Sequence, residues 1–179
     1  MKILDLGCGE GSDLSVWGVS ELDDITGVDI NHDRLCQARR NYPKRHFIQC
    51  AGESLPFANG TFDMVISGVA LPYMNMQPTL RETNRVLTPE GVLYASLHPY
   101  GFTLRELYKS FPRPMPTIYR AYVLINGVIL HLIGRTLRFV NHRTESFQTR
   151  RGMRLASRKA GFNVCICNTS KQKFKILLS

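Results

Sequence analysis

Gly7, Gly9 and Gly11 stand at alternate positions after a short apolar run, and Asp29 stands at the end of a second apolar run. Such glycines allow a tight turn and a close approach of the backbone to a ligand, with the amides of a following helix pointing at it. A carboxylate at Asp29, eighteen residues after Gly11, can accept hydrogen bonds from both hydroxyls of a ribose. The glycines alone also fit an ordinary strand-to-helix turn, but the two features together predict a nucleotide-like ligand.

The glycine spacing separates two kinds of nucleotide ligand. The fingerprint for nicotinamide dinucleotides is Gly-x-Gly-x-x-Gly, whose third glycine permits close packing of a helix. Here the third glycine is Gly11, and the next residue is Ser12. This spacing disfavours a dehydrogenase without excluding one.

Apolar runs and helical periodicity alternate over the first hundred residues. We expect strands over 3–6, 25–30, 47–50, 62–67 and 92–97, with helices just after Gly11, over 33–42 and from 78 to 87. A helix over 148–160 and an antiparallel hairpin of strands over 162–168 and 174–178 follow. The pattern predicts an α/β fold with a doubly wound, Rossmann-like, mostly parallel seven-stranded sheet that is covered on both faces.

Between the fifth and sixth predicted strands, residues 100 to about 147 form a Pro-rich, aromatic and basic block. We expect a cap insertion here, over the carboxyl edge of the sheet, where open α/β sheets bind ligands. Within it, residues 121–134 predict either two strands around an Asn126-Gly127 turn or one apolar helix. The run is interrupted by Asn126 and His131 and is shorter than the roughly 20 residues of a spanning helix, so we expect no membrane span.

Length and composition set the class of protein. A chain of 179 residues with 44% apolar residues predicts one globular domain over 1–179. Its five cysteines form no Cys-x-x-Cys pair, and no secretory signal opens the sequence, so we expect a cytoplasmic protein.

Charge is distributed unevenly along the chain. Residues 1–99 carry 8 Lys+Arg against 12 Asp+Glu, whereas residues 100–179 carry 15 against 2. The basic half predicts either an anionic partner, such as nucleic acid, a phosphorylated substrate or a lipid headgroup, or a solvated face that serves solubility. Both interpretations stay open.

Four segments, ILDLGCGEG, GVDI, ESLPFANGTFDMVIS and RVLTPEGVLYASL, follow one another in a characteristic order and spacing. In these segments the sequence resembles the class I S-adenosylmethionine-dependent methyltransferases. The resemblance extends to Ala160-Gly161-Phe162 and the terminal hairpin but says nothing about the cap. It implies a Rossmann-like fold, S-adenosylmethionine as the cofactor and S-adenosylhomocysteine as the product.

The resemblance also implies which residues hold the cofactor, all of them at or just after strand ends. These are Asp5, Gly7, Cys8 and Gly9 for the methionine portion, Asp29 for the ribose, Ile30, Gly52 and Glu53 for the adenine, and Ser67 near the methionine amino group and the sulfonium. Many relatives have an aspartate for the adenine amino group where this chain has Ala51. We therefore expect backbone groups to recognise the adenine.

Methyl transfer from a sulfonium is an in-line displacement that needs alignment in a dry site, so a general base is optional. His98 is the candidate base because it follows the fifth predicted strand and its ordinary pKa lies near 6.5. Tyr73 is a second catalytic candidate, and Tyr73, His98, Tyr100 and Arg105 are candidates for orienting the substrate, although each could equally be structural. His131 and His142 have no partners at ligand spacing, so we expect no metal.

The segments LPF, LPYM and LHPYG resemble the small-molecule branch of the family, so a small-molecule acceptor, anionic or apolar, is the first prediction. RNA is second, because only the basic half supports it. The third alternative is a non-catalytic cofactor-binding or scaffold protein. The chain starts just before its first predicted strand and lacks the family's usual N-terminal helices, so an oligomeric partner could be needed to close the cofactor site.

Overall fold

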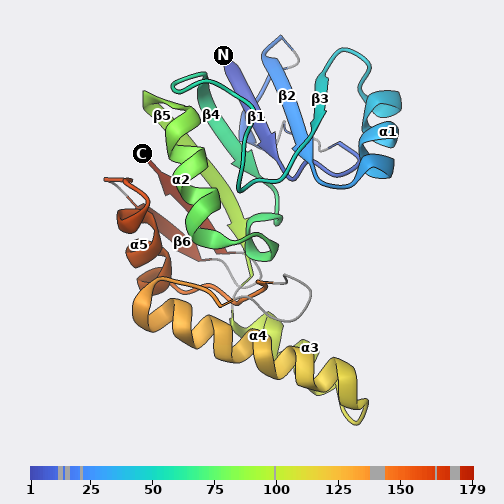
Figure 1. The fold of residues 1–179 in the computed structure, drawn as a ribbon, viewed down its shortest axis with the longest axis vertical. Coiled ribbons are helices and arrows are strands. Elements are labelled where there is room, and N and C mark those ends of the chain that lie inside the picture. The colour runs from blue at the N-terminus through green and yellow to red at the C-terminus, as the bar shows by residue number, and fades with distance from the viewer. Residues whose placement is uncertain are drawn as a thin grey trace.

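The computed structural model describes residues 1–11, 14, 17–20, 22–98, 100–137, 144–163, 165–169 and 174–179. Its centre is a sheet with the strand order β3-β2-β1-β4-β5-β7-β6 (Figure 1). The strands are β1 (Lys2–Leu6), β2 (Asp24–Asp29), β3 (His46–Gln49), β4 (Phe62–Ser67), β5 (Leu87–Leu97), β6 (Cys165–Thr169) and β7 (Phe174–Leu178). The helices are α1 (His32–Asn41), η2 (Leu71–Tyr73, a 3-10 turn), α2 (Met76–Val86), α3 (Tyr100–Ser110), α4 (Pro114–Ile133) and α5 (Arg150–Lys159).

The five strands from β1 to β5 are parallel, and the two C-terminal strands are not. β1 lies between β2 and β4, β2 pairs with β3, and β4 pairs with β5, all in parallel. β7 runs antiparallel to both β5 and β6. The predicted Rossmann-like, mostly parallel sheet is therefore confirmed, and the carboxyl ends of the parallel strands share one edge.

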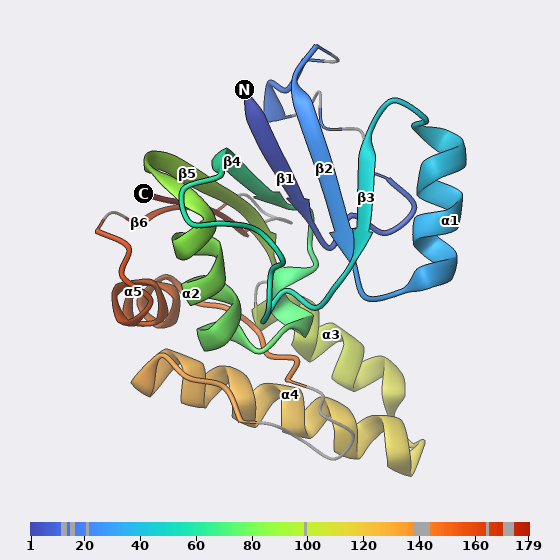
Figure 2. The same cartoon turned by 45° about the horizontal axis from the view of Figure 1, so that its top comes forward.

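Side chains alternate between two apolar clusters, one on each face of the sheet. Ile3, Ile25 and Ile66 pack with Leu14 and Val19 on one face. The larger cluster on the other face joins the strands to the apolar sides of α2 and α5, including Leu4, Val65, Leu93, Leu80, Val86, Met153 and Ala156. Both faces are thus covered, and α2 and α5 lie next to each other in front of the sheet (Figure 2).

Caps and backbone pairings set the helix bounds within a few residues of the predicted ones. Asn31 caps α1 by accepting a hydrogen bond from the amide of Arg34 at 3.0 Å. α5 begins two residues later than predicted because the amide of Gln148 donates to the carbonyl of His98 at 2.9 Å. The helix expected just after Gly11 includes residues outside the described ranges.

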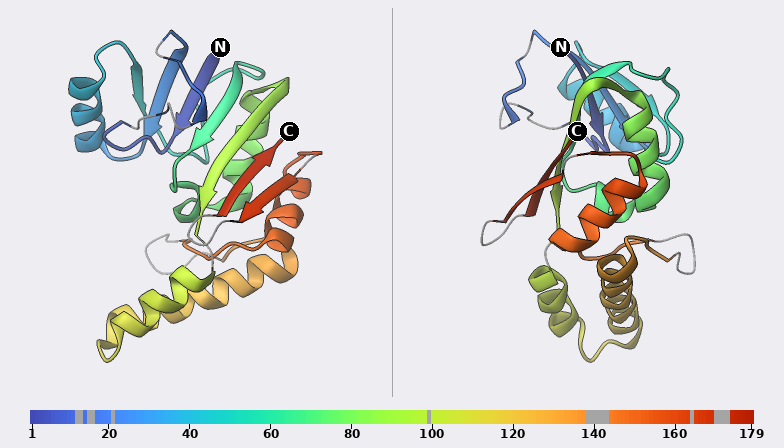
Figure 3. Two further views of the ribbon diagram at one scale, coloured as in Figure 1. Left: turned by 180° about the vertical axis from the view of Figure 1, so that it is seen from behind. Right: turned by 90° about the vertical axis from the view of Figure 1, so that its left-hand side faces the viewer.

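The block from 100 to 147 is more regular than its sequence suggests. α3 and α4 form a helical pair beyond the carboxyl end of β5 (Figure 3), and residues 121–134, for which the sequence leaves two alternatives, belong to one helix and its C-cap. Gly127 is accommodated inside α4 because the ring of Phe147 occupies the place where a Cβ would stand. His142 and Pro99 lie outside the described residues.

α4 is also longer than the apolar run recognised in the sequence. It has 20 residues, and a stretch of 18 of them has a mean hydropathy of 1.3, so length and composition alone would let it cross a membrane. The predicted apolar run is therefore only part of this helix, which begins at Pro114, seven residues before the run. Core helices of soluble proteins also meet this criterion.

Candidate functional site

A cavity of about 610 Å³ opens at the carboxyl ends of β1, β2 and β4. Backbone and side chains from the loops after these strands form its wall. The lining residues are Leu6, Gly7, Val28, Asp29, Ile30, Arg34, Cys50, Ala51, Gly52, Glu53, Gly68, Val69, Ala70, Tyr73 and Met74. The volume lies within the range of ligand sites for cofactor-sized molecules.

The loop after β1 is held close to the ends of its neighbours. The amides of Gly7 and Cys8 both donate to the carbonyl of Val28, at 2.8 and 3.0 Å. Gly7 has a φ of +75°, and a Cβ at this position would lie 2.1 Å from the Cβ of Ala70. Only glycine meets both requirements, so the first glycine of the motif is fixed by backbone conformation and by packing against the segment before η2.

Asp29 is oriented by two backbone amides. Its Oδ2 accepts a hydrogen bond from the amide of Gly9 and its Oδ1 accepts one from the amide of Asn31, both at 2.9 Å. Each carboxylate oxygen can accept more than one hydrogen bond, so both retain capacity for a ligand hydroxyl. This held carboxylate on the cavity wall fits a ribose diol.

The segment after β3 forms another part of the wall. The amide of Asn75 donates to Glu53 Oε1 at 2.7 Å, which turns this side chain toward the start of α2. A Cβ on Gly52 would lie 2.7 Å from the sulfur of Met74, so the backbone here is packed tightly against that side chain. Ala51 lines the cavity beside it without a side-chain donor or acceptor, which fits adenine recognition by backbone groups.

The structure divides the predicted cofactor residues into two groups. Gly7, Asp29, Ile30, Gly52 and Glu53 line the cavity. The remaining four, which are not among its lining residues, are Asp5, Cys8, Gly9 and Ser67. In this second group, the side chains of Asp5, Cys8 and Ser67 are buried, and the amide of Gly9 donates to Asp29 on the cavity wall.

The surroundings of two buried members of the second group, Cys8 and Ser67, are well defined. Burial, with the charges of Asp5 and Asp29, raises the pKa of Cys8 to about 12, so this thiol stays protonated. The hydroxyl oxygen of Ser67 accepts a hydrogen bond from the amide of Leu71 at 3.2 Å and thereby holds the start of η2.

Tyr73 and His98 form a pair at the border of the cavity. The hydroxyl oxygen of Tyr73 lies 3.0 Å from His98 Nε2, and the imidazole stacks on the ring of Phe102 at 4.7 Å. Burial lowers the pKa of His98, and burial together with the charge of Glu145 raises the pKa of Tyr73. Both shifts favour the neutral side chains near neutral pH, a state in which one proton can be shared between them.

The other two substrate candidates lie apart from this pair. Tyr100 starts α3 and lines a separate groove between α3 and α4, and Arg105 is exposed on α3. Neither belongs to the cavity wall.

A second hollow, of about 290 Å³, shares Tyr73 with the larger cavity and is further lined by Tyr119, Thr144 and Glu145. Buried Glu145 accepts a hydrogen bond from the hydroxyl of Tyr119 at 2.5 Å and one from Arg120 at 3.0 Å. The hollow therefore combines aromatic surface with a charge that is already neutralised. Sequence reasoning missed Tyr119 and Glu145 because these residues carry no motif and meet only through the fold of α4.

Three further wall residues were also missed. Arg34 comes from α1 and Met74 from the turn after η2. Val69, directly after β4, has a φ of +99°, which is rare for a β-branched residue and marks a strained backbone on the cavity wall. Strain of this kind gives no signal in the sequence.

Among the residues that the structure describes, no cluster of three or more His, Cys, Asp or Glu side chains could hold a metal ion. His131 instead lies 2.9 Å from the hydroxyl of Thr149, at the N-cap of α5.

Comparison with known proteins gives one family match and several relatives. A family model described as a methyltransferase domain matches residues 4–95. Malonyl-[acyl-carrier protein] O-methyltransferase of Enterobacter lignolyticus is 33% identical over 93 residues, which are 51% of this chain and 37% of the relative. Demethylmenaquinone methyltransferase of Chlorobaculum tepidum is 28% identical over 110 residues, which are 60% of this chain and 46% of the relative.

The chain thus spans less than half the length of these two curated relatives. Among solved structures, an S-adenosylmethionine-dependent methyltransferase from Methanosarcina mazei superposes with a TM-score of 0.66 at 20% identity, covering 99% of this chain and 91% of that one. This likeness concerns the fold.

Proposed function

Since this chain belongs to the S-adenosylmethionine-dependent methyltransferase family, we propose that it transfers a methyl group from S-adenosylmethionine to a small-molecule acceptor. The observation that carries the proposal is the junction of two hollows at Tyr73, one large enough for the cofactor and one smaller, beneath α4. When bound, S-adenosylmethionine supplies a methyl group on a positively charged sulfur. The acceptor would approach it from the smaller hollow.

In the larger cavity, we assign each part of the cofactor to wall residues. The carboxylate of Asp29 would accept hydrogen bonds from the ribose hydroxyls, because the amides of Gly9 and Asn31 already fix its position. Gly7 would let the methionine portion approach the backbone, and Ala51 and Gly52 would face the adenine. Ile30, an exposed apolar residue on this wall, would cover one face of the adenine ring.

At the acceptor side, Tyr73 and His98 would orient the accepting group and take up its proton. A neutral imidazole can accept a proton, and the 3.0 Å separation lets the tyrosine hydroxyl relay one. Tyr119 and Glu145 would shape the acceptor's pocket, since Arg120 already balances the glutamate charge. A pocket of this composition favours an acceptor with apolar surface and a few hydrogen-bonding groups.

The names of relatives support small acceptors. They specify a malonyl group on an acyl-carrier protein in one case and demethylmenaquinone in the other. We propose that the acceptor of this chain is likewise a small or carrier-bound molecule with an apolar part. A cytoplasmic site of action fits the free thiols of Cys8, Cys36 and Cys50.

The test is a transfer assay with S-adenosylmethionine labelled on its methyl group, offered to separate aqueous, lipid and RNA fractions of an extract. Label should appear in a small-molecule or lipid product. Tyr73→Phe and His98→Gln should slow transfer by about 10²-fold or more while cofactor affinity stays within about threefold of wild type. Tyr94→Phe, a matched change on β5, should leave the rate unchanged.

Two results would contradict the proposal. Transfer of label to the RNA fraction alone would show that the acceptor is RNA and not a small molecule. Unchanged transfer rates in both variants would show that Tyr73 and His98 take no part in the reaction.

A further inference from the structure

The outward side of α4 is apolar along its whole length. Its side chains recur at intervals of three, four or seven residues, so they lie on one face of the helix. Between 48% and 76% of each side chain is exposed, and the series is Met115, Ile118, Ile125, Val128 and Leu132. Only 22% of the most apolar window of this helix is buried, in contrast to an ordinary core helix.

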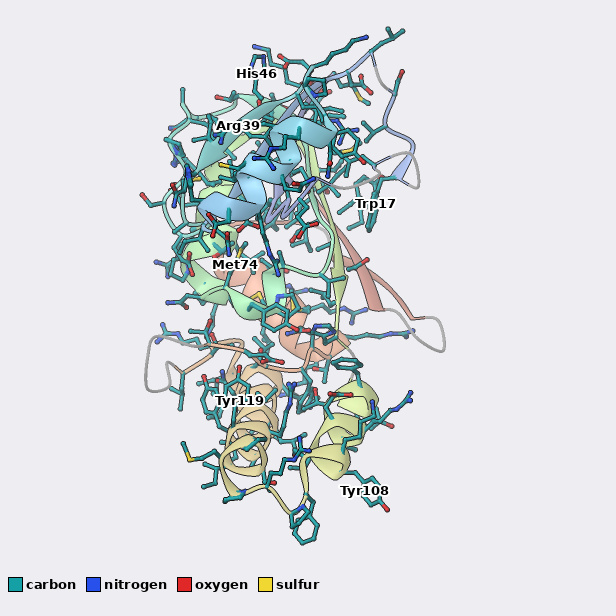
Figure 4. All side chains as sticks on the ribbon, turned by 90° about the vertical axis from the view of Figure 1, so that its right-hand side faces the viewer. Trp17, Arg39, His46, Met74, Tyr108 and Tyr119 are labelled. Carbon is teal, nitrogen blue, oxygen red and sulfur yellow. The ribbon has the colours of Figure 1, made fainter. Side chains whose placement is uncertain are left out.

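α3 continues this surface. The two helices lie side by side (Figures 2 and 3). Tyr108, 85% exposed, lies in the last turn of α3, and Phe111, 74% exposed, lies between the two helices. Tyr108 points away from the rest of the molecule (Figure 4). Leu104 and Val128 line a groove of about 450 Å³ between the helices, whose lining is apolar. We call these exposed residues of α3, α4 and their turn, with Leu104 included, the apolar face.

Exposed arginines surround the apolar face. Arg105 lies on α3, Arg113 directly precedes α4, and Arg135 follows its end. Within the described part of the chain, none of the three forms an ion pair. The two acidic residues between 100 and 179 are already neutralised, Glu106 by Lys109 and Glu145 by Arg120.

The inner side of α4 shows that the helix stays attached to the domain. Its Leu130 belongs to the main core, and it packs along α5. The side chain of Asn126 is fully buried, accepts a hydrogen bond from the amide of Leu137 at 2.6 Å and donates to the carbonyls of Thr144 and Glu145. A helix held in this way presents one face and does not cross a bilayer.

We infer that the apolar face docks on the surface of an anionic lipid bilayer, with α4 lying parallel to it. The aliphatic and aromatic side chains would enter the boundary between headgroups and acyl chains, and the arginines would meet lipid phosphates. A second copy of the chain is the poorer occupant, since it would bring two sets of uncompensated arginines together. Docking of the apolar face on a bilayer does not depend on methyl transfer.

The experiment is co-sedimentation of the full chain with vesicles of phosphatidylcholine alone and of phosphatidylcholine mixed with phosphatidylglycerol. We expect binding to the mixed vesicles and at least about fivefold weaker binding to the neutral ones, since basic residues near an anionic surface are attracted to it. Ile118→Glu with Ile125→Glu should reduce the partition coefficient by about tenfold or more. Arg105→Glu with Arg113→Glu should abolish the preference for anionic vesicles.

Leu22→Glu and Lys44→Glu are the matched controls, because both residues are exposed in the segments around β2 and α1, away from the apolar face. They should bind vesicles like wild type. The unfolding midpoint of every variant should stay at the wild-type value, which separates loss of binding from loss of fold.

Failure of wild type to bind anionic vesicles would overturn the inference, as would binding that the isoleucine variants leave unchanged. A dimer in sedimentation equilibrium that the same variants dissociate would assign the apolar face to a second copy instead.

Discussion

The cofactor side and the α3–α4 side of this molecule are built by different means. Around the cavity, backbone groups set the positions of the wall residues: Gly7 fits against Ala70, and two backbone amides hold the carboxylate of Asp29. Around α4, side chains hold distant segments together: Asn126 of α4 donates to the carbonyl of Glu145, and Arg120 of α4 pairs with the carboxylate of Glu145. Backbone-built sites leave a compact motif in the sequence, whereas side-chain-built sites leave almost none.

The largest effect should come from the cofactor side. Gly7→Ala should lower the free energy of unfolding by about 2–6 kcal/mol, because it combines backbone strain with a clash against Ala70, and should abolish cofactor binding. Gly18→Ala is the matched control, since Gly18 has a similar φ of +78° with nothing within 4 Å of its Cβ. Denaturant unfolding of both variants measures the difference, and equal losses would show that the close approach of Gly7 is unimportant.

On the α3–α4 side, the largest loss of stability should follow removal of the buried side-chain amide of Asn126. Asn126→Ala leaves the amide of Leu137 and two carbonyls without their partner, at about 1–3 kcal/mol for each group that stays unsatisfied. Ile125→Ala, on the exposed face of the same helix, should change stability by less than about 0.5 kcal/mol. Cofactor affinity should stay within about threefold in both variants. A large loss of cofactor affinity in Asn126→Ala would mean that the structure of the cofactor cavity depends on the packing of α4.

The third expected effect is a loss of cofactor affinity without a loss of stability. Asp29→Asn should weaken binding of S-adenosylmethionine by about 1.5–3 kcal/mol, on the order of 10- to 150-fold, because the charged acceptor for the ribose hydroxyls is lost. Asp33→Asn, a matched change on the exposed first turn of α1, should leave the affinity unchanged. Calorimetric titration measures both, and equal affinities would remove Asp29 from the site.

The smallest expected effect is a pH dependence of stability caused by His98, which lies between the cofactor side and the α3–α4 side. Burial lowers the pKa of His98 below its ordinary value of 6.5, so the folded chain binds fewer protons than the unfolded chain just below that pH. Stability should therefore fall as the pH drops through 6.5 toward the lowered pKa. His98→Gln should remove this slope in unfolding curves recorded from pH 7.5 to 5, and a slope that persists would assign it to another group.

Prediction from sequence succeeded where one short segment determines its own structure. The alternation of apolar runs and helical periodicity indicated a doubly wound, mostly parallel sheet and the edge that carries the cavity, since alternation and turn chemistry are local. The family resemblance implied five of the wall residues. The resemblance also implied Asp5 and Ser67 as cofactor residues, and the structure buries both side chains, which no local pattern shows because burial depends on neighbouring strands. The sequence pattern could not decide the conformation of 121–134, where Gly127 disfavours a helix until Phe147 packs against it.

The measurement that tests the central claim most directly is calorimetric titration of the purified chain with S-adenosylmethionine, S-adenosylhomocysteine and, as a control, NAD. The account predicts micromolar binding of the first two and none of NAD, because the wall offers a fixed carboxylate for a ribose and a glycine loop with the methyltransferase spacing. Equal binding of NAD, or no binding of S-adenosylmethionine by a chain that unfolds cooperatively, would contradict the assignment of the cavity.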